Sequence, residues 1–173
     1  MFISESFYIS CQSVQIKKSR SYKNAQALCR DDGECLFILN SSGLIVADGN
    51  LHHVCFTWDS GNGKTQIYKD GNLSKIMVNV RIGKKIKGGG IWVIGQDQDS
   101  LGGSFQAVDS FKGILTEVNI WDRVLGFDEI KRFAKDCDLL MQGNYKAYAD
   151  FDISRATRLI KPSSCHFASI PKS

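Results

Sequence analysis

The sequence predicts an all-β fold, an antiparallel β-sandwich of jelly-roll type with one short helix. Three observations predict it: most segments alternate apolar and polar residues with a period of two, they end at glycine or asparagine turns, and only one late segment has helical spacing. At 173 residues the chain is long enough to bury one core. We therefore expect a single domain over residues 1–173.

The strand pattern is interrupted by short turn signals. Strands are expected at residues 36–39, 44–46, 53–58, 65–69, 91–94 and 113–121. The turn at residues 60–63 reads Ser-Gly-Asn-Gly, and Asp70-Gly71 is the dipeptide most typical of a tight hairpin. Residues 53–58 and 65–69 are therefore expected to form strands on either side of the first turn, with a tight hairpin at 69–72.

The one convincing helical pattern covers about residues 127–135. Ile130, Phe133 and Ala134 recur at helical spacing, and Asp128 and Glu129 precede them. Acidic side chains are favourable in the first turn of a helix because they face the positive end of its dipole. We expect this helix to pack on the sheet.

Charge and hydropathy exclude several classes of protein. The formal net charge of +4 is mild, and the basic clusters at 17–20 and 84–87 lack interleaved aromatic residues, so nucleic acid is not an expected partner. We interpret both clusters as solvated strand ends or turns, with contact to an anionic surface as the alternative. No apolar run approaches the roughly 20 residues of a membrane span.

Cysteine usage favours an oxidising compartment. The six cysteines are even in number and lack the CxxC spacing of structural zinc sites, so disulfides are the favoured interpretation. Two Asn-x-Ser sequons, at Asn40 and Asn72, are compatible with a secreted glycoprotein. Residues 1–5 show no signal-peptide pattern. We therefore expect a fragment, or an incomplete N-terminus, of a longer secreted chain.

The strongest functional signal is the loop at residues 95–106. Asp97 and Asp99 lie two residues apart, which places both carboxylates on one side of an extended segment, while Gly102 and Gly103 allow the backbone to turn back toward them. Ca²⁺ takes about 6–8 oxygen ligands from such carboxylates, amides and carbonyls. The loop predicts a calcium site, and the alternative is a polar surface turn.

Several motifs in order give the chain a resemblance to the pentraxin domain. The family's His-x-Cys-x-Ser/Thr-Trp signature matches His53, Cys55, Thr57 and Trp58. Downstream, the family's calcium loop matches residues 95–105. The strand leading into its single helix matches residues 110–114 and 118–125, and the start of that helix matches 128–130. The resemblance implies a lectin-like sandwich of the laminin-G and concanavalin type, and cyclic oligomers are common in the family.

The resemblance also implies two calcium ions in the loop. Asp97 and Asp99 match the bridging carboxylates of the family, and Gln98 matches a position that offers its backbone carbonyl. Asp97 replaces the family's commoner glutamate with a shorter carboxylate of the same charge.

The remaining ligand positions depart from the family pattern. Gln106 and Asp109 fall where the family has Glu and Gln, so the carboxylate count is kept but its position moves. Asp32 matches the ligand of an earlier turn, where Gly33 lacks the amide that the family supplies. One of the two ion sites is therefore expected to lose a side-chain ligand, which weakens binding.

The resemblance implies a disulfide between Cys11 and Cys55, which would tie two strands across the core. From proximity and parity alone, Cys29 is expected to pair with Cys35, and Cys137 with Cys165. Free buried thiols are the alternative for these four cysteines.

Ligand recognition in the family uses the calcium ions to hold phosphate or another anionic group beside an apolar pocket. Ile38 falls near that pocket, and Asp48 is the one candidate for its acidic partner. We expect a secreted calcium-dependent module that binds phosphorylated or carbohydrate ligands, in innate recognition, a receptor ectodomain or the matrix. A calcium-independent adhesion or scaffold domain is the alternative.

Catalysis is not expected. Asp97 and Asp99 could in principle serve as the paired carboxylates of a glycoside hydrolase, but no tryptophan cluster lies near them. His52 and His53 adjoin Cys55, yet strand geometry puts His52 and Cys55 on opposite faces. We interpret both histidines as core or edge residues.

Overall fold

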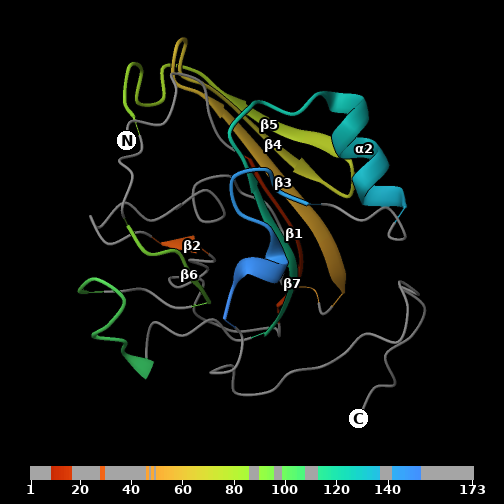
Figure 1. The fold of residues 1–173 in the computed structure, drawn as a ribbon. Coiled ribbons are helices and arrows are strands. Elements are labelled where there is room, and N and C mark those ends of the chain that lie inside the picture. The colour runs from red at the N-terminus through yellow and green to blue at the C-terminus, as the bar shows by residue number, and fades with distance from the viewer. Residues whose placement is uncertain are drawn as a thin grey trace.

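The computed structural model describes residues 9–16, 28–29, 46, 48, 50–85, 90–95, 99–107, 113–136 and 142–152. Within them the main element is a five-stranded antiparallel sheet with the strand order β5-β4-β3-β1-β7 (Figure 1). Its strands are β1 (Ile9–Ile16), β3 (Leu51–Asp59), β4 (Lys64–Lys69), β5 (Asn72–Met77) and β7 (Gly113–Trp121). The first strand thus lies between two strands that follow much later in the chain.

The central strands confirm the sequence predictions. The predicted strands at 53–58, 65–69 and 113–121 coincide with β3, β4 and β7 to within two residues. The predicted strand at 91–94 is shorter, because β6 comprises only Val93–Ile94, which pairs with β2 (Leu28–Cys29). Of the predicted strand at 44–46, the described residue Val46 is buried but lies outside any strand. The predicted strand at 36–39 lies outside the described residues.

The predicted tight hairpin is confirmed between β4 and β5. Asp70 and Gly71 both have positive φ, 51° and 76°, as a type I′ turn requires. Gly71 also lies against the helix, since a Cβ there would meet the Ala134 side chain at 3.0 Å and the Lys131 backbone at 3.3 Å. A side chain larger than glycine would therefore strain both the turn and its contact with the helix.

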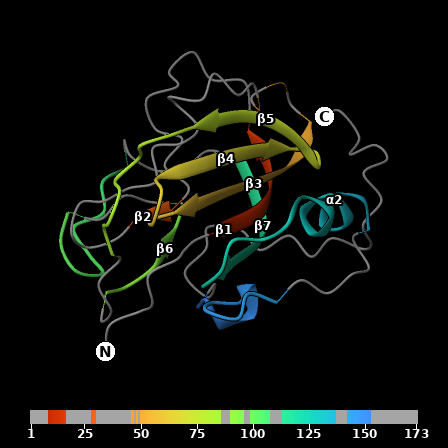
Figure 2. The ribbon, with the colours of Figure 1, turned by 90° about the horizontal axis from the view of Figure 1, so that it is seen from above.

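Helix α2 (Phe127–Lys135) has the predicted bounds and covers one face of the sheet (Figure 2). Ile130 is fully buried, and with Phe133 it packs on a cluster of core residues, Cys55, Tyr68, Trp121 and Leu125. Trp121 and Phe133 stack with ring centroids 5.9 Å apart. The Glu129 carboxylate in the first turn forms an ion pair with Arg123. Apolar periodicity therefore decided which side of α2 faces the sheet.

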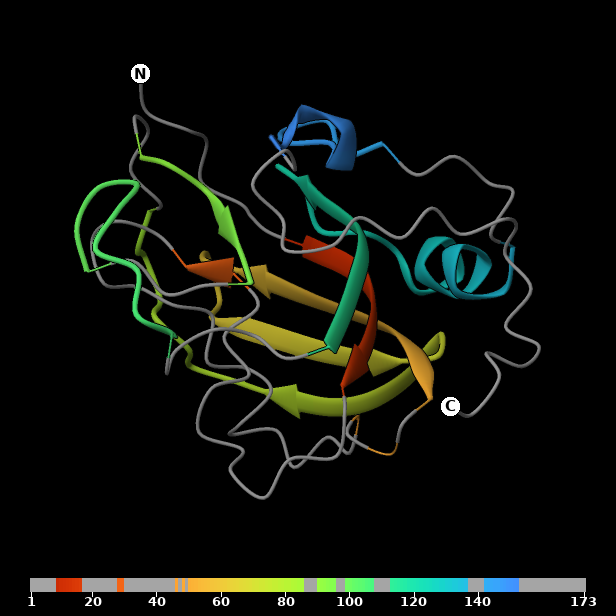
Figure 3. The same cartoon turned by 90° about the horizontal axis from the view of Figure 1, so that it is seen from below.

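The second layer of the sandwich packs on the opposite face. Val118 and Ile120 of β7 are buried there against aliphatic and aromatic side chains from residues 92–94 and from the segment that contains the short helix η3 (Tyr148–Asp150). These partners include Trp92, Ile94, Tyr145 and Tyr148. Figure 3 shows η3, in blue, beside β7. Residues 118 and 120 lie on one face of β7 and Trp121 lies on the other, so β7 contributes side chains to both cores.

Residues 143–148 pair with the edge of β7 that has no neighbouring strand in the described part of the sheet. The Ile120 amide donates to the Lys146 carbonyl at 2.8 Å, and the Ile120 carbonyl accepts from the amides of Tyr145 and Lys146 at 3.1 Å. Asn119 is fully buried, and its Oδ1 accepts from the amides of Gly143 and Tyr148, each at 3.1 Å. One buried amide therefore anchors the last described segment. Among the described residues, no helix has the length and apolarity needed to cross a membrane.

Candidate functional site

The described part of the predicted calcium loop is a closed turn. The Gly103 amide donates to the Ser100 carbonyl at 3.0 Å, and the hydroxyls of Ser100 and Ser104 lie 2.8 Å apart. Gly102 has a φ of 64°, and a Cβ at that position would meet Ile91 Cδ1 at 2.9 Å. This glycine is therefore needed both for the left-handed backbone and for the close approach of Ile91, as the sequence predicted for the turn.

The turn brings together two of the predicted metal ligands. Gln106 Nε2 donates to Asp99 Oδ2 at 2.7 Å, although the residues are seven positions apart. Both side chains are exposed, so solvent and ions reach them. A carboxylate and an amide offer the hard oxygen atoms that Ca²⁺ prefers, and neither residue type is a favoured ligand of a soft metal. The donor chemistry of this pair therefore fits calcium.

Two ligands do not complete a metal centre. Asp32, Asp97, Gln98 and Asp109 lie outside the described residues, as does Ile38 of the predicted apolar pocket. Among the residues that the structure describes, no group of three His, Cys, Asp or Glu side chains could hold a metal ion. The pairing of Asp99 with Gln106 is thus the part of the predicted site that the structure places.

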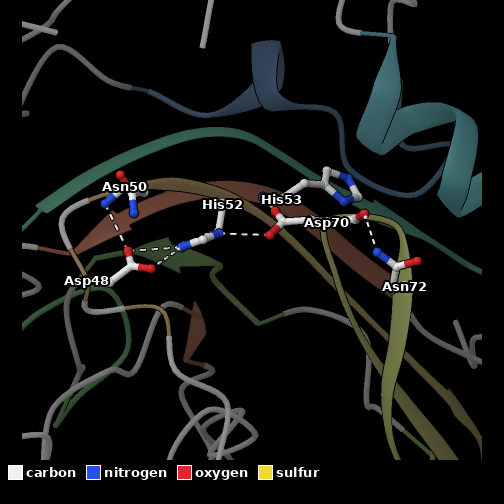
Figure 4. Close-up of polar contacts among 6 residues, drawn as sticks. All are labelled: Asp48, Asn50, His52, His53, Asp70 and Asn72. Carbon is white, nitrogen blue, oxygen red and sulfur yellow. Dashed lines mark hydrogen bonds and ion pairs between the residues drawn. The ribbon is translucent and has the colours of Figure 1, made fainter. Parts of the chain in front are cut away.

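A polar cluster that sequence reasoning did not find lies at the start of β3 (Figure 4). His52 Nδ1 lies 2.9 Å from Asp70 Oδ2, and His52 Nε2 lies 3.0 Å from both carboxylate oxygens of Asp48. Asp70 Oδ1 also accepts from the His53 amide at 3.0 Å. Ionised carboxylates only accept hydrogen bonds, so His52 lies between two acceptors, one against each ring nitrogen.

This cluster gives Asp48 a different set of partners from the predicted one. The Asn50 backbone amide and His52 both donate to the Asp48 carboxylate and hold its pKa at about 2. Sequence analysis had considered Asp48 as the acidic partner of a ligand pocket, whereas its carboxylate binds His52. Asp48 lies only four residues before His52, whereas Asp70 is separated from His52 by most of β3 and by β4, and no local pattern reveals that longer contact.

His53 is a core residue, as predicted. Its side chain is 4% exposed, and both ring nitrogens lack a hydrogen-bond partner. Burial lowers its pKa from 6.5 to about 4, and the nearby Asp70 carboxylate opposes the shift only in part. His53 is therefore neutral at physiological pH. Its burial against the sheet, with no nucleophile paired to it, argues for packing rather than chemistry.

The sheet register places Cys11 directly opposite Cys55. Cys55 is fully buried and disulfide-bonded. Directly opposed residues on antiparallel strands have Cα atoms about 4.5–5.5 Å apart, within the range that a disulfide spans. The predicted partners Cys35, Cys137 and Cys165 lie outside the described residues, and of Cys29 only the strand position in β2 is described.

Known proteins that contain pentraxin domains are similar to this chain in sequence. The chain is 40% identical over 120 residues to the sushi, von Willebrand factor type A, EGF and pentraxin domain-containing protein 1 of Rattus norvegicus. The aligned region covers 69% of this chain and 3% of that protein. It is 39% identical over 110 residues to neuronal pentraxin-2 of Homo sapiens, spanning 64% of this chain and 25% of that protein. The chain thus spans about a quarter or less of the length of these relatives.

A solved structure shares the fold. The native heptameric SAP-like pentraxin from Limulus polyphemus matches with a TM-score of 0.63 and 22% identity, covering 84% of this chain and 77% of that one. The sequence profile described as the Pentaxin family matches residues 8–154, which is most of the chain. The chain therefore belongs to the pentraxin family.

Proposed function

We propose that this chain is a calcium-dependent recognition domain of an extracellular protein, and that its ligands carry phosphate or carbohydrate groups. The observation that carries the proposal is the contact between Asp99 and Gln106 on the closed turn at residues 99–106. It brings two oxygen-bearing side chains together at the loop position where the family resemblance implies calcium ligands. Membership of the pentraxin family supports the same assignment.

The residues of this chain would hold the ion through oxygen atoms. Asp99 supplies a carboxylate. A flip of the Gln106 side-chain amide would place its oxygen, in place of its nitrogen, beside Asp99 Oδ2. The remaining proposed ligands are Asp32, Asp97, Gln98 and Asp109. Bound calcium would supply positive charge to anionic or hydroxyl oxygens of a ligand. Ile38 is proposed as the apolar contact beside it.

The wider setting of the domain is also proposed. We infer a single domain over residues 1–173 that acts by binding rather than catalysis, in an extracellular glycoprotein with disulfides. Cys11 and Cys55 are the proposed central bridge, supported by their register and by the half-cystine at Cys55. The Limulus pentraxin is heptameric, which supports a cyclic homo-oligomer as the quaternary state to look for.

Calcium titration by calorimetry on the oxidised protein tests the proposal. We expect saturable binding with a Kd on the order of 10⁻⁴–10⁻³ M, the range of many extracellular modules. The double variant Asp97→Ala, Asp99→Ala should abolish the heat of binding. Asp128→Asn is the matched control, because this exposed carboxylate lies on α2, outside the loop.

The outcomes separate the two functions considered. Loss of binding in the double variant and its retention in Asp128→Asn would justify a screen of phosphorylated and sugar ligands in calcium buffer. No heat at millimolar calcium from a protein with a cooperative thermal transition would contradict the proposal. The calcium-independent adhesion or scaffold function would then be the leading hypothesis.

A further inference from the structure

We propose that Asn72 carries an N-linked glycan that covers the β5 edge of the main sheet. The inference rests on the proposed extracellular location. Asn72-Leu73-Ser74 is an Asn-x-Ser acceptor with no proline at its central position, and it starts β5 immediately after the Asp70-Gly71 turn. The chemistry is an N-glycosidic bond between Asn72 Nδ2 and C1 of the first sugar. The C1–O bond to a dolichol-linked pyrophosphate breaks, dolichyl pyrophosphate leaves, and Nδ2 gives up one hydrogen as a proton.

The folded chain leaves the whole acceptor accessible. Asn72, Leu73 and Ser74 are all exposed. Figure 4 shows the Asn72 amide at the end of the β4–β5 hairpin beside Asp70, whose carbonyl accepts from Asn72 Nδ2 at 3.2 Å. A glycosylated amide nitrogen keeps one hydrogen, so this contact is compatible with the modification. No rearrangement of the hairpin is needed to accommodate a sugar.

The neighbouring glycine marks the point at which the hairpin contacts the helix. Gly71 is buried against Ala134 and Lys131 of α2, where no room remains for a substituent. Asn72 is the first residue past this contact at which the side chain is exposed. The hairpin is therefore closed on the side of the helix and open at the start of β5.

The strand that follows has features that a glycan would protect. β5 is the last strand in the order of the main sheet, so one of its edges has no neighbouring strand among the described residues. Leu73 and Ile76 are 42% and 49% exposed along it, and Val78, directly after its end, is 65% exposed. An exposed apolar edge strand is a template for pairing with another chain. A glycan at the first residue of β5 would exclude a second chain from this edge.

The edge already contains two milder protective features. The register shifts between Ile67 and Tyr68, where Ser74 is the extra residue of a bulge, and Lys75 follows it. Bulges and lysines are common protections of edge strands. They interrupt the pairing pattern without covering Leu73 or Ile76, which is the role that we assign to the glycan.

The test is expression of the chain behind a heterologous signal peptide in mammalian cells, with the other sequon removed. Asn40→Gln should retain one glycan that peptide N-glycosidase F releases. The double variants Asn40→Gln, Asn72→Gln and Asn40→Gln, Ser74→Ala should lose that mass, and Asn40→Gln, Ser74→Thr should keep it. Occupancy is read both in the secreted protein and in the cell lysate, so poor secretion does not hide the result.

An Asn40→Gln protein without any glycan in either fraction would overturn the assignment. Sedimentation velocity tests the shielding role by comparing Asn40→Gln with Asn40→Gln, Asn72→Gln. The variant without the glycan is expected to form larger assemblies than the glycosylated one. Equal association of the two would overturn that role. Glycan transfer does not require calcium, so failure of the calcium proposal leaves these readouts unchanged.

Discussion

At the scale of single residues, burial rather than a chemical partner sets the properties of His53. The ring is enclosed in the core with both nitrogens unpaired, and its pKa is lowered to about 4. His52, one residue away on the other face, has a carboxylate against each nitrogen. Adjacent histidines on one strand therefore meet opposite environments, because successive side chains point to opposite faces.

His53 should make the protein sensitive to mild acid. Its pKa is about 6.5 when unfolded and about 4 when folded, so the unfolded chain binds the proton more readily between these values and stability falls as pH drops. From pH 7 to pH 5 we expect this residue to remove about 2 kcal/mol of unfolding free energy. His53→Phe should abolish most of that dependence in urea unfolding.

Wild type and His53→Phe are compared between pH 7 and pH 5. Most carboxylates titrate below pH 5, so they contribute little to the pH dependence of stability in this range. The Asp48 carboxylate, whose pKa is lowered to about 2, loses its stabilising contacts only at still lower pH. An unchanged pH dependence in His53→Phe would contradict the assignment. His53→Leu provides a second apolar variant in case the larger ring does not fit the core.

At the scale of elements, the segment 142–152 depends on close backbone contact with β7. A Cβ on Gly143 would lie 2.3 Å from the Lys146 carbonyl oxygen and 2.4 Å from that of Ile120. These are backbone atoms that cannot rotate away. The buried Asn119 amide adds a second constraint, because its oxygen accepts from two backbone amides of the same segment. The segment is thus held by contacts that only a small residue permits.

Gly143→Ser should therefore destabilise the protein by at least about 2 kcal/mol, because the added atoms force the segment away from β7. Gly126→Ser is the matched control. Gly126 is the N-cap of α2, has no neighbour within 4 Å of an added Cβ, and makes no side-chain cap bond, so serine there should stabilise by several tenths of a kcal/mol. Thermal and urea unfolding measure both, and equal effects would refute the contact argument.

At the scale of the whole molecule, β1 is an interior strand that joins the β5-β4-β3 part of the main sheet to β7. It pairs with β3 on one side and with β7 on the other. Cys11 of β1 lies opposite Cys55 of β3, whose side chain is in the core beneath α2. A bridge here would close a loop that contains all of the chain between the two strands.

If Cys11 and Cys55 are bridged, the losses of stability caused by replacing each of them should be strongly non-additive. Cys11→Ala and Cys55→Ala should each cost about 3–4 kcal/mol through loss of a bridge that closes a loop of this length. The double variant should cost little more than either single one, because the second substitution removes no further covalent bond. Urea unfolding measures the cycle, and disulfide mapping by mass spectrometry identifies the bridge. Additive effects would show that Cys55 has another partner.

Much of the fold could be predicted from local patterns. The alternation of residues 53–58, the Asp70-Gly71 turn and the apolar spacing of α2 each depend on neighbours in the chain, and the structure confirms all three. The contact between Asp99 and Gln106 was also foreseeable, because the glycine turn between them is encoded locally. The predicted strand at 91–94 was longer than the observed β6, because the apolar run continues beyond the two residues that pair.

By itself, the sequence determined the local conformations, the apolar faces and the family motifs, because each depends on residues close together in the chain. Only the tertiary structure decided that Asp48 and Asp70 meet at His52, that Gly143 lies against Ile120, and that β5 forms an edge of the main sheet. These features depend on which distant strands pair. Strand pairing is set by the packing of the whole core, and no short segment of the chain contains that information.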